Sequence, residues 1–364
     1  AFAGVEMSTK NPVAPPEEPA PNFCDIFDYA TLYDNEQNAV LQKFSFTGRL
    51  QADAAFFYGG DEDYEELLWR RARAGIKATV FQDFTIHAET NWLLNSPGPD
   101  YIGLTDANIA WSRSDEFRLK VGKQGAAFTG DGATSSKKLL RLERSLLSNN
   151  LWFPAEYYTG VTASGTVNNW YYNIGGFSSD LAQEFSEFNA GYFGLISIGR
   201  DFGESWDVDK AFVRLDYVYN EDDPLNGTRN LENVISLNGK FENGDAGVWT
   251  DVAYGTGYGS QSDIFAISLM PFYNLSEKVQ LVASYNFVTS NGDNGVRLDR
   301  YENRTNGARR VDEAHEFYAG FNYYLCGHKL KWQTGVEYTT TSDGPNDGGD
   351  YNGWGVSSGI RLYW

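Results

Sequence analysis

Basic side chains recur at every second position in several stretches of the sequence. In RRARAGIK, residues 70–77, the side chains of Arg71, Arg73 and Lys77 lie on one face if the chain is extended. A row of guanidinium and ammonium groups offers no nucleophile, and its chemistry is to attract and hold anions. The candidate residues of this kind are Arg49, Arg71, Arg73, Lys77, Arg118 and Lys120, with Glu89 and Asp106 as acidic counterparts.

The long segment at residues 125–156 holds a second group of charges. Segments of about 30 residues between regular elements are usually functional or disordered, and the apolar side chains of this one require burial. Its run SSKKLLRLERSLLS, residues 135–148, predicts a short helix with a serine cap. We expect the segment to fold inward against a wall of strands and to narrow a channel. Its basic residues are Lys137, Lys138, Arg141 and Arg144, and its apolar residues are Leu139, Leu140, Leu142, Leu146, Leu147, Leu151, Trp152 and Phe153.

The elements that must position these residues are strands with alternating apolar and polar side chains. In FSFTGRLQADAAF, residues 44–56, Phe44 and Phe46 lie on one face while Arg49 and Asp53 lie on the other. Such runs match the roughly 9–11 residues that cross a membrane obliquely. Sixteen candidates follow, at residues 44–56, 68–80, 84–92, 104–112, 117–124, 157–166, 170–177, 189–201, 211–220, 233–241, 246–255, 263–273, 278–289, 314–325, 329–339 and 354–364.

The connections between these strands alternate between short turns and long polar segments. This alternation is typical of outer-membrane barrels, which have short periplasmic turns and longer outer loops. The aromatic content of 16% and the 38 glycines favour strands and turns, and the formal net charge of -20 argues against nucleic acid as a partner. We therefore predict an all-β fold, a 16-stranded antiparallel transmembrane β-barrel with an infolded third extracellular loop, in which the strand at 354–364 pairs with the first. The alternative is a soluble all-β sandwich or propeller, but the repeat of about 40–50 residues that marks a propeller is missing.

Two regions are expected along the chain. Residues 1–40 are predicted to form a periplasmic Pro-rich extension, which could reach peptidoglycan or another envelope protein, and residues 41–364 to form the barrel. Cys24 and Cys326 are both periplasmic by the parity of the strands, and that compartment is oxidising, so we expect a disulfide between them. The two cysteines form no zinc or redox motif, and neither a metal nor a cofactor is predicted.

Short motifs in the first half of the chain resemble those of the phosphate-selective porin family, porins O and P. They are RRARAG at 70–75, VGKQ at 121–124, TSS at 134–136, LERSL at 142–146 and TGV at 159–161. The resemblance implies a homotrimeric channel surrounded by lipid in the outer membrane of a Gram-negative bacterium. By motif position, Arg71 and Arg73 correspond to the family's strand-two pair, and Glu143 with Arg144 to the acidic–basic pair of its third loop.

The charges of the predicted channel wall leave its selectivity open. A mildly basic interior beneath acidic outer segments could pass anions, or facing basic and acidic walls could form a general pore. We favour a general or weakly selective porin for passive diffusion of small hydrophilic solutes and ions, with an anion- or phosphate-selective channel as the alternative. Many single wall charges are expected to form salt bridges within the wall. The inward bases are predicted to be Lys43, Arg49, Arg71, Arg73, Lys77, Arg118, Lys120, Arg214, Lys240, Lys331 and Arg361, and the inward acids Asp53, Glu89, Asp106, Asp216, Asp251, Glu316 and Glu337.

Two further functions carry less weight. A barrel hydrolase needs a serine and a histidine on one strand face. The three histidines, His87, His315 and His328, do not stand two residues from a serine on such a face. We therefore predict that the protein is not an enzyme. The hypothesis of a structural barrel that only anchors the envelope is supported by the Pro-rich extension alone.

Overall fold

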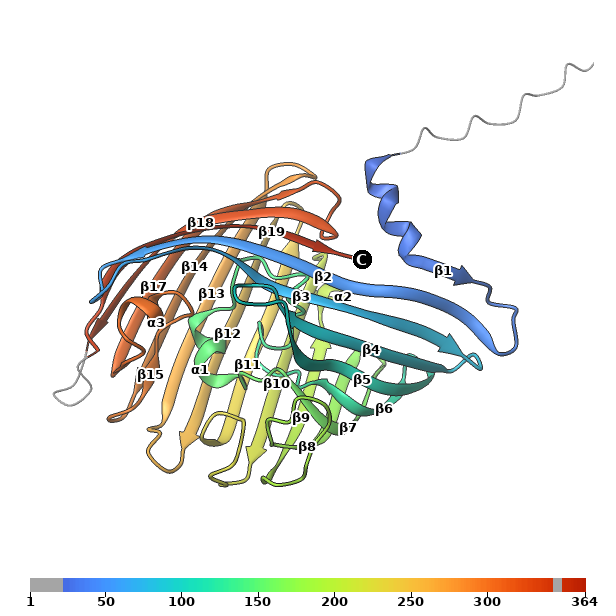
Figure 1. Ribbon diagram of the computed structural model, residues 1–364, viewed down its shortest axis with the longest axis horizontal. Coiled ribbons are helices and arrows are strands. Elements are labelled where there is room, and N and C mark those ends of the chain that lie inside the picture. The colour runs from blue at the N-terminus through green and yellow to red at the C-terminus, as the bar shows by residue number, and fades with distance from the viewer. Residues whose placement is uncertain (1–21, 343–348) are drawn as a thin grey trace, which may run out of the picture.

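A computed structural model describes residues 22–342 and 349–364 of the chain, and sixteen of its strands close into a barrel (Figure 1). Each strand pairs antiparallel with the next, and β19 pairs with β2 to close the ring, with Val356 opposite Phe56. The predicted number of strands and the pairing of the last strand with the first are confirmed. The barrel strands are β2 (Leu41–Tyr58), β3 (Tyr64–Val80), β4 (Phe84–Leu93), β5 (Asp100–Ser114), β6 (Phe117–Gly125), β7 (Tyr157–Val167), β8 (Trp170–Ser178), β9 (Tyr192–Asp201), β10 (Lys210–Asn220), β11 (Leu231–Asn243), β12 (Ala246–Gly257), β13 (Ile264–Asn274), β14 (Val279–Ser290), β17 (Glu313–Tyr324), β18 (Leu330–Ser342) and β19 (Asn352–Tyr363).

The two faces of the wall differ in chemistry. On β2, Phe46 and Phe56 are exposed on the outside, whereas Asp53 is completely buried inside. Ile360 on β19 is likewise exposed, and its neighbour Arg361 is buried. Apolar side chains thus cover the outside and polar ones the inside, which is the reverse of a water-soluble protein. No helix of the described residues has the length and apolar character needed to cross a membrane.

A β-bulge in β3 departs from the predicted alternation. Gln51 of β2 pairs with Arg71 while Ala52 pairs with Trp69, so Arg70 is left without a partner in the ladder. An extra residue on one strand interrupts the in–out order. As a result, the side chains of Arg70 and Arg71 both reach the interior, where alternation predicts only one of them.

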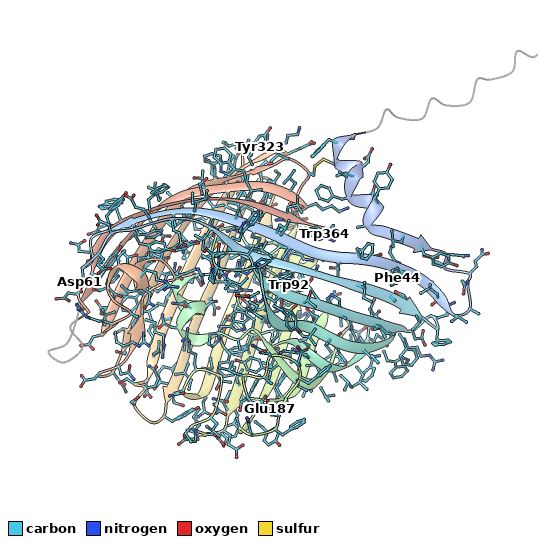
Figure 2. The ribbon with its side chains drawn as sticks, in the orientation of Figure 1. Phe44, Asp61, Trp92, Glu187, Tyr323 and Trp364 are labelled. Atoms are coloured by element: carbon cyan, nitrogen blue, oxygen red, sulfur yellow. A yellow bond between two sulfur atoms is a disulfide. The ribbon has the colours of Figure 1, made fainter. Side chains whose placement is uncertain are left out.

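The segment before the barrel is held against its short-turn end. Helix η1 (Phe23–Ala30) is a 3-10 helix, and β1 (Thr31–Asp34) adds a short strand that pairs with β2. A disulfide joins Cys24 to Cys326 in the β17–β18 turn, as predicted. Figure 2 shows this disulfide and, close to η1, Trp364. An apolar groove of about 760 Å³ lies between η1 and the outer wall. Most of the predicted Pro-rich extension lies outside the described residues.

The connection between β6 and β7, residues 126–156, is here called the inner loop. It lies within the ring of strands, where α1 (Leu146–Leu151) packs against β12, β13 and β14 (Figure 1). The predicted helix at 135–148 is wrong in position, because the helix begins only at Leu146 after the Ser145 cap. Residues 139–142 are not helical, because side chains of the wall bind their carbonyl groups in place of the next helical turn.

The remaining short elements lie in other connections. Helix α2 (Gly203–Trp206) joins β9 to β10. The connection at residues 291–312 is here called the 291–312 loop. It contains β15 (Val296–Arg297), α3 (Glu302–Thr305) and β16 (Arg310–Val311), with β15 paired to β16.

Candidate functional site

The inner loop is fixed to one side of the barrel interior by hydrogen bonds from the wall. Lys331 Nζ donates to the Leu139 carbonyl at 2.6 Å. Asn322 Nδ2 donates to the Leu140 carbonyl at 3.0 Å. Earlier in the inner loop, Ser136 Oγ accepts a hydrogen bond from Arg49 Nη1 of β2 at 2.7 Å. The loop therefore occupies the side formed by β10–β19 and β2, and the charged side chains of β3–β6 border the rest of the interior.

Apolar contacts complete the attachment. The predicted burial of the loop's leucines and aromatic residues is confirmed, with Leu146, Leu147 and Leu151 completely buried. Phe153 packs edge-on against Phe128 and also against Phe193 of the wall. Burying a leucine side chain stabilises by roughly 1.5–3 kcal/mol, so the position of the loop is set largely by its apolar side.

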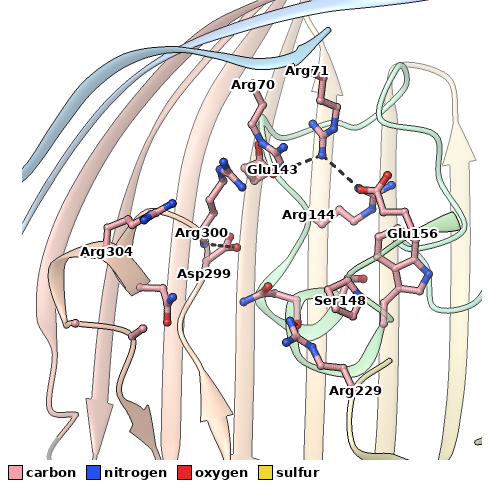
Figure 3. A pocket seen from close by; sticks show the side chains of 16 residues that line it. Arg70, Arg71, Glu143, Arg144, Ser148, Glu156, Arg229, Asp299, Arg300 and Arg304 are labelled. Atoms are coloured by element: carbon pink, nitrogen blue, oxygen red, sulfur yellow. Dashed lines mark hydrogen bonds and ion pairs between the residues drawn. The ribbon is translucent and has the colours of Figure 1, made fainter. Parts of the chain in front are cut away.

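An arginine cluster lies where the inner loop meets β3. Arg70 binds the Glu143 carboxylate through both Nε and Nη2, the latter at 2.8 Å. Arg71 Nη2 lies 3.8 Å from Glu143 and 3.7 Å from Glu156. Glu156 also pairs with Arg73 at 3.4 Å and with Arg144 at 3.0 Å. Figure 3 shows Arg70, Arg71 and Arg144 around the two carboxylates. Two carboxylates of the loop thus connect four arginines, which form a rigid charged network.

The electrostatics of this cluster keep both loop carboxylates ionised. Burial alone would raise the pKa of Glu143, but Arg70 and Arg71 hold it well below its usual range. Burial acts in the same way on Glu156, and Arg144, Arg71 and Arg73 hold its pKa well below the usual range. The cluster therefore stays in its paired state throughout the physiological pH range.

A cavity of about 470 Å³ opens beside the cluster, at the end of the barrel that carries the long loops (Figure 3). Arg229 of the β10–β11 connection lies there, with its Nη2 donating to the Asn149 carbonyl at 2.6 Å. Sequence alternation did not single out Arg70 or the arginines that come from the connections. The adjacent arginines at 70–71 were one available signal of a β-bulge. Strict alternation would put one of them on the apolar outer face, where a charge is unfavourable. The charged residues that line the cavity are Arg70, Arg71, Arg144, Arg229, Arg300 and Arg304, with Glu143, Glu156 and Asp299.

Toward the short-turn end, a second group of cations borders the interior. Lys77 of β3 and Lys120 of β6 are electrostatic neighbours of each other, of Arg118 and of Asp106. Within the described chain, Lys77, Arg118 and Lys120 form no salt bridge, whereas Asp106 lies 3.6 Å from His87 Nδ1. This lysine cluster is defined as Lys77, Arg118, Lys120 and the loop residue Lys137. It faces Asp106, and Lys137 also lies near Glu89, which is already paired with Arg49.

Lys137 brings the inner loop into the lysine cluster. Its Nζ lies 3.5 Å from Thr47 Oγ1 and 5.0 Å from the ring centre of Tyr363. Burial and the nearby Arg49 lower the pKa of Lys137 to about 8. The charge of Lys137 therefore changes with pH not far above neutrality.

Four predicted site residues are placed differently from the rest. Arg49 and Glu89 are buried between the two clusters, with Arg49 Nη2 at 3.1 Å from Glu89 Oε1. Arg141 of the inner loop pairs instead with Glu316 of β17 and Glu337 of β18. The neighbouring Lys138 is exposed. The structure therefore brings together Arg71, Arg73 and Arg144 in one cluster, and Lys77, Arg118, Lys120, Lys137 and Asp106 in another.

A closed antiparallel barrel with an apolar outside, a polar inside and an inner loop is the architecture of outer-membrane porins. A family model for the phosphate-selective porins O and P matches residues 44–250, more than half of the chain. The chain belongs to this family, as its motifs indicated. It is a passive diffusion channel for small hydrophilic solutes in the outer membrane of a Gram-negative bacterium.

Solved structures support the fold. The anion-selective porin from Comamonas acidovorans is 12% identical, with 88% of this chain and 99% of that chain covered and a TM-score of 0.62. OmpF of Salmonella typhi is 12% identical, with 92% and 100% covered and a TM-score of 0.62. OmpT of Vibrio cholerae in a trimer form is 16% identical, with 88% and 99% covered and a TM-score of 0.55. No curated protein matches the sequence.

Proposed function

We propose that this porin is weakly selective for small anions and that the lysine cluster sets the preference. The observation that carries this proposal is the charge balance of the interior next to β3 and β6. Four cations lie there, namely Lys77, Arg118, Lys120 and Lys137. They face Asp106, and the carboxylate of Glu89 near Lys137 is already paired with Arg49. Local potential at a narrow point, not net charge, decides which ions enter. An excess of cations there favours anions even though the whole chain carries a formal charge of -20.

The paired state of the arginine cluster supports weak selectivity over strict selectivity for phosphate. Glu143 and Glu156 already occupy donors of Arg70, Arg71, Arg73 and Arg144. A dianion would have to compete with these carboxylates for the guanidinium groups. The acidic connection at residues 61–66 adds repulsion at the long-loop end, where Asp61 is exposed. A further acidic stretch of the sequence, residues 343–350, lies mostly outside the described residues.

A phosphate-selective channel remains the second candidate, because one observation favours it. Arg300 and Arg304 line the 470 Å³ cavity and form no salt bridge within the described residues. Together with Arg229, they could bind a phosphate group that enters from outside. Such a site would make chloride conduction sensitive to micromolar phosphate, whereas a weakly selective pore would not respond.

We test the proposal with reversal potentials in planar bilayers under a potassium chloride gradient. Replacing Lys77 and Lys120 by glutamine removes two unpaired charges. One unit charge about 4 Å from an ion in water is worth about 1 kcal/mol, so the anion-to-cation permeability ratio should fall several-fold. Lys278→Gln, in the exposed β13–β14 turn, is the control and should leave the ratio unchanged. An unchanged ratio in the double variant would rule out the lysine cluster.

We also propose that the chain assembles as a homotrimer, does not catalyse a reaction, and carries its N-terminal segment on the periplasmic side. OmpT, which shares the fold, has been solved in a trimer form. In the described chain, His87 contacts Asp106 and His315 contacts Glu313 and Tyr285, and neither contacts a serine.

The disulfide holds η1 at the short-turn end, which is periplasmic in such barrels. Contact of the preceding residues with peptidoglycan or another envelope protein is part of the same proposal, although these residues lie outside the described chain. A barrel that serves only as an envelope anchor would leave the inner loop without a purpose.

A further inference from the structure

Three buried glutamates that belong to neither basic cluster meet inside the barrel. Glu302 comes from α3 in the 291–312 loop, Glu316 from β17 and Glu337 from β18. One carboxylate oxygen from each lies within 4.8 Å of the other two. Glu302 is 1% exposed and Glu316 is 0% exposed. Water therefore does not solvate these charges, and each needs a partner inside the protein.

Protein groups satisfy only part of this requirement. Arg141 of the inner loop pairs with one oxygen of Glu316 and, at 3.0 Å, with Glu337 Oε2. Thr339 Oγ1 donates to Glu302 Oε1 at 3.2 Å. The second oxygens, Glu302 Oε2 and Glu316 Oε2, are buried without a hydrogen-bond donor among the described residues. Two unpartnered carboxylate oxygens at the same place indicate that a positively charged group is missing from the protein's own set of partners.

The charge balance indicates what this group is. Three carboxylates and one guanidinium leave two negative charges, and the buried Asp299 is an electrostatic neighbour of Glu316 and Glu337. A small enclosed cavity of about 10 Å³ lies among Arg141, Glu302 and Glu337, which is room for about one water-sized species. Hard oxygen ligands are those that calcium and magnesium prefer, and calcium tolerates irregular geometry.

We propose that Glu302, Glu316 and Glu337 bind one divalent cation of the calcium type, which clamps the 291–312 loop to the barrel wall. The cation would join α3 to β17 and β18 and, through Arg141, to the inner loop. It would also fix the residues next to Glu302. Tyr301 donates to Asp53 Oδ2 of β2 at 2.8 Å, and Arg300 and Arg304 line the 470 Å³ cavity. Occupancy would therefore set the position of two arginines at the entrance of the channel.

The alternative is that protons neutralise the cluster. Burial, followed by the neighbouring Glu337 and Asp299, raises the pKa of Glu302 well above its ordinary value. A glutamic acid at this position could share a proton with Glu337. A divalent cation and a shared proton predict opposite results when Glu302 loses its charge. Glutamine mimics the protonated acid but is a poor ligand for the cation.

Terbium alone is a suitable probe, because Tyr301 and Tyr318 line the small cavity and can sensitise its luminescence. The folded full-length protein in detergent, stripped with a chelator, is titrated with terbium and then with calcium. We expect tyrosine-sensitised emission from a saturable site of one ion per chain that calcium displaces. Glu302→Gln should weaken this site at least tenfold. Glu313→Gln, a half-exposed glutamate on the same strand as Glu316, should bind as the wild type does. Equal binding in the wild type and Glu302→Gln would overturn the proposal.

Hydrogen exchange of residues 299–306, measured in the wild type and in Glu302→Gln, gives a second readout. Calcium should slow exchange of this segment in the wild type and should leave the β13–β14 turn unchanged. Glu302→Gln should show the fast exchange of the calcium-free protein in either condition. Exchange that is already slow without calcium in the wild type, and equally slow in Glu302→Gln, would show that shared protons hold the cluster. Either of these results decides the question even if one variant folds poorly.

Discussion

Lys137 is a loop residue whose charge changes near neutral pH. Burial and Arg49 lower its pKa to about 8, so it is protonated below that pH and neutral above it. We expect the anion-to-cation permeability ratio of the wild type to fall by a few-fold as the pH rises from 6 to 9. Lys137→Gln should show, at every pH, the low anion-to-cation ratio that the wild type has at pH 9. Lys137→Arg should keep, at pH 9, the high ratio that the wild type has at pH 6. A wild-type ratio that does not change with pH would contradict this assignment.

Glu156 should have the opposite effect on selectivity. It neutralises Arg71, Arg73 and Arg144 together, at 3.7, 3.4 and 3.0 Å. Glu156→Gln leaves three buried guanidinium groups with too few carboxylates, and we expect the anion-to-cation ratio to rise several-fold. Loss of a buried partner costs about 1–3 kcal/mol, so the urea midpoint of unfolding in detergent should also fall. Glu187→Gln, on the exposed β8–β9 connection, is the control, and a lower ratio in Glu156→Gln would contradict the prediction.

At the scale of elements, the disulfide attaches η1 to the barrel without being part of it. A salt bridge also joins η1 to that turn, between Lys329 and Asp28 at 3.4 Å, but it is exposed and therefore weak. Replacing Cys24 and Cys326 by serine should leave the barrel folded and its conductance unchanged. The segment before β2 should become sensitive to proteinase K, as mass spectrometry of the digest would show. Resistance equal to that of the wild type would mean that the apolar groove alone holds η1.

The elements differ in how far the sequence predicts them. Strands such as β2 and β19 can be predicted from the alternation of apolar and polar residues, because their outer face lies in apolar surroundings and their inner face contacts polar groups. The same reasoning could not place Arg70, since a bulge changes the face that a residue occupies without changing the sequence pattern. It also could not find Arg300 or Glu302, because connections have no period from which to read direction. The loop helix was misplaced because wall side chains, distant in sequence, bind the carbonyls of residues 139–142.

At the scale of the whole molecule, the proposed homotrimer makes a direct prediction about mass. Native mass spectrometry in a mild detergent should show a species of three 40.7 kDa chains, and heating in dodecyl sulfate should convert it to single chains. The barrel of each chain is closed by β19 and β2, so a single chain should keep its strands when the trimer separates. Gentle dissociation followed by circular dichroism would check this. A single-chain mass under all native conditions would exclude the trimer.

The wall binds the inner loop through peptide carbonyls, which every amino acid possesses. Lys331 and Asn322 donate to the peptide carbonyls of Leu139 and Leu140, so these hydrogen bonds do not depend on which apolar side chains stand at the two positions. The attachment of the inner loop to the wall is therefore independent of the side chains that the loop presents to solutes. Related channels can therefore change residues such as Lys137 or Lys138, and with them the preferred solute, while the inner loop keeps its position.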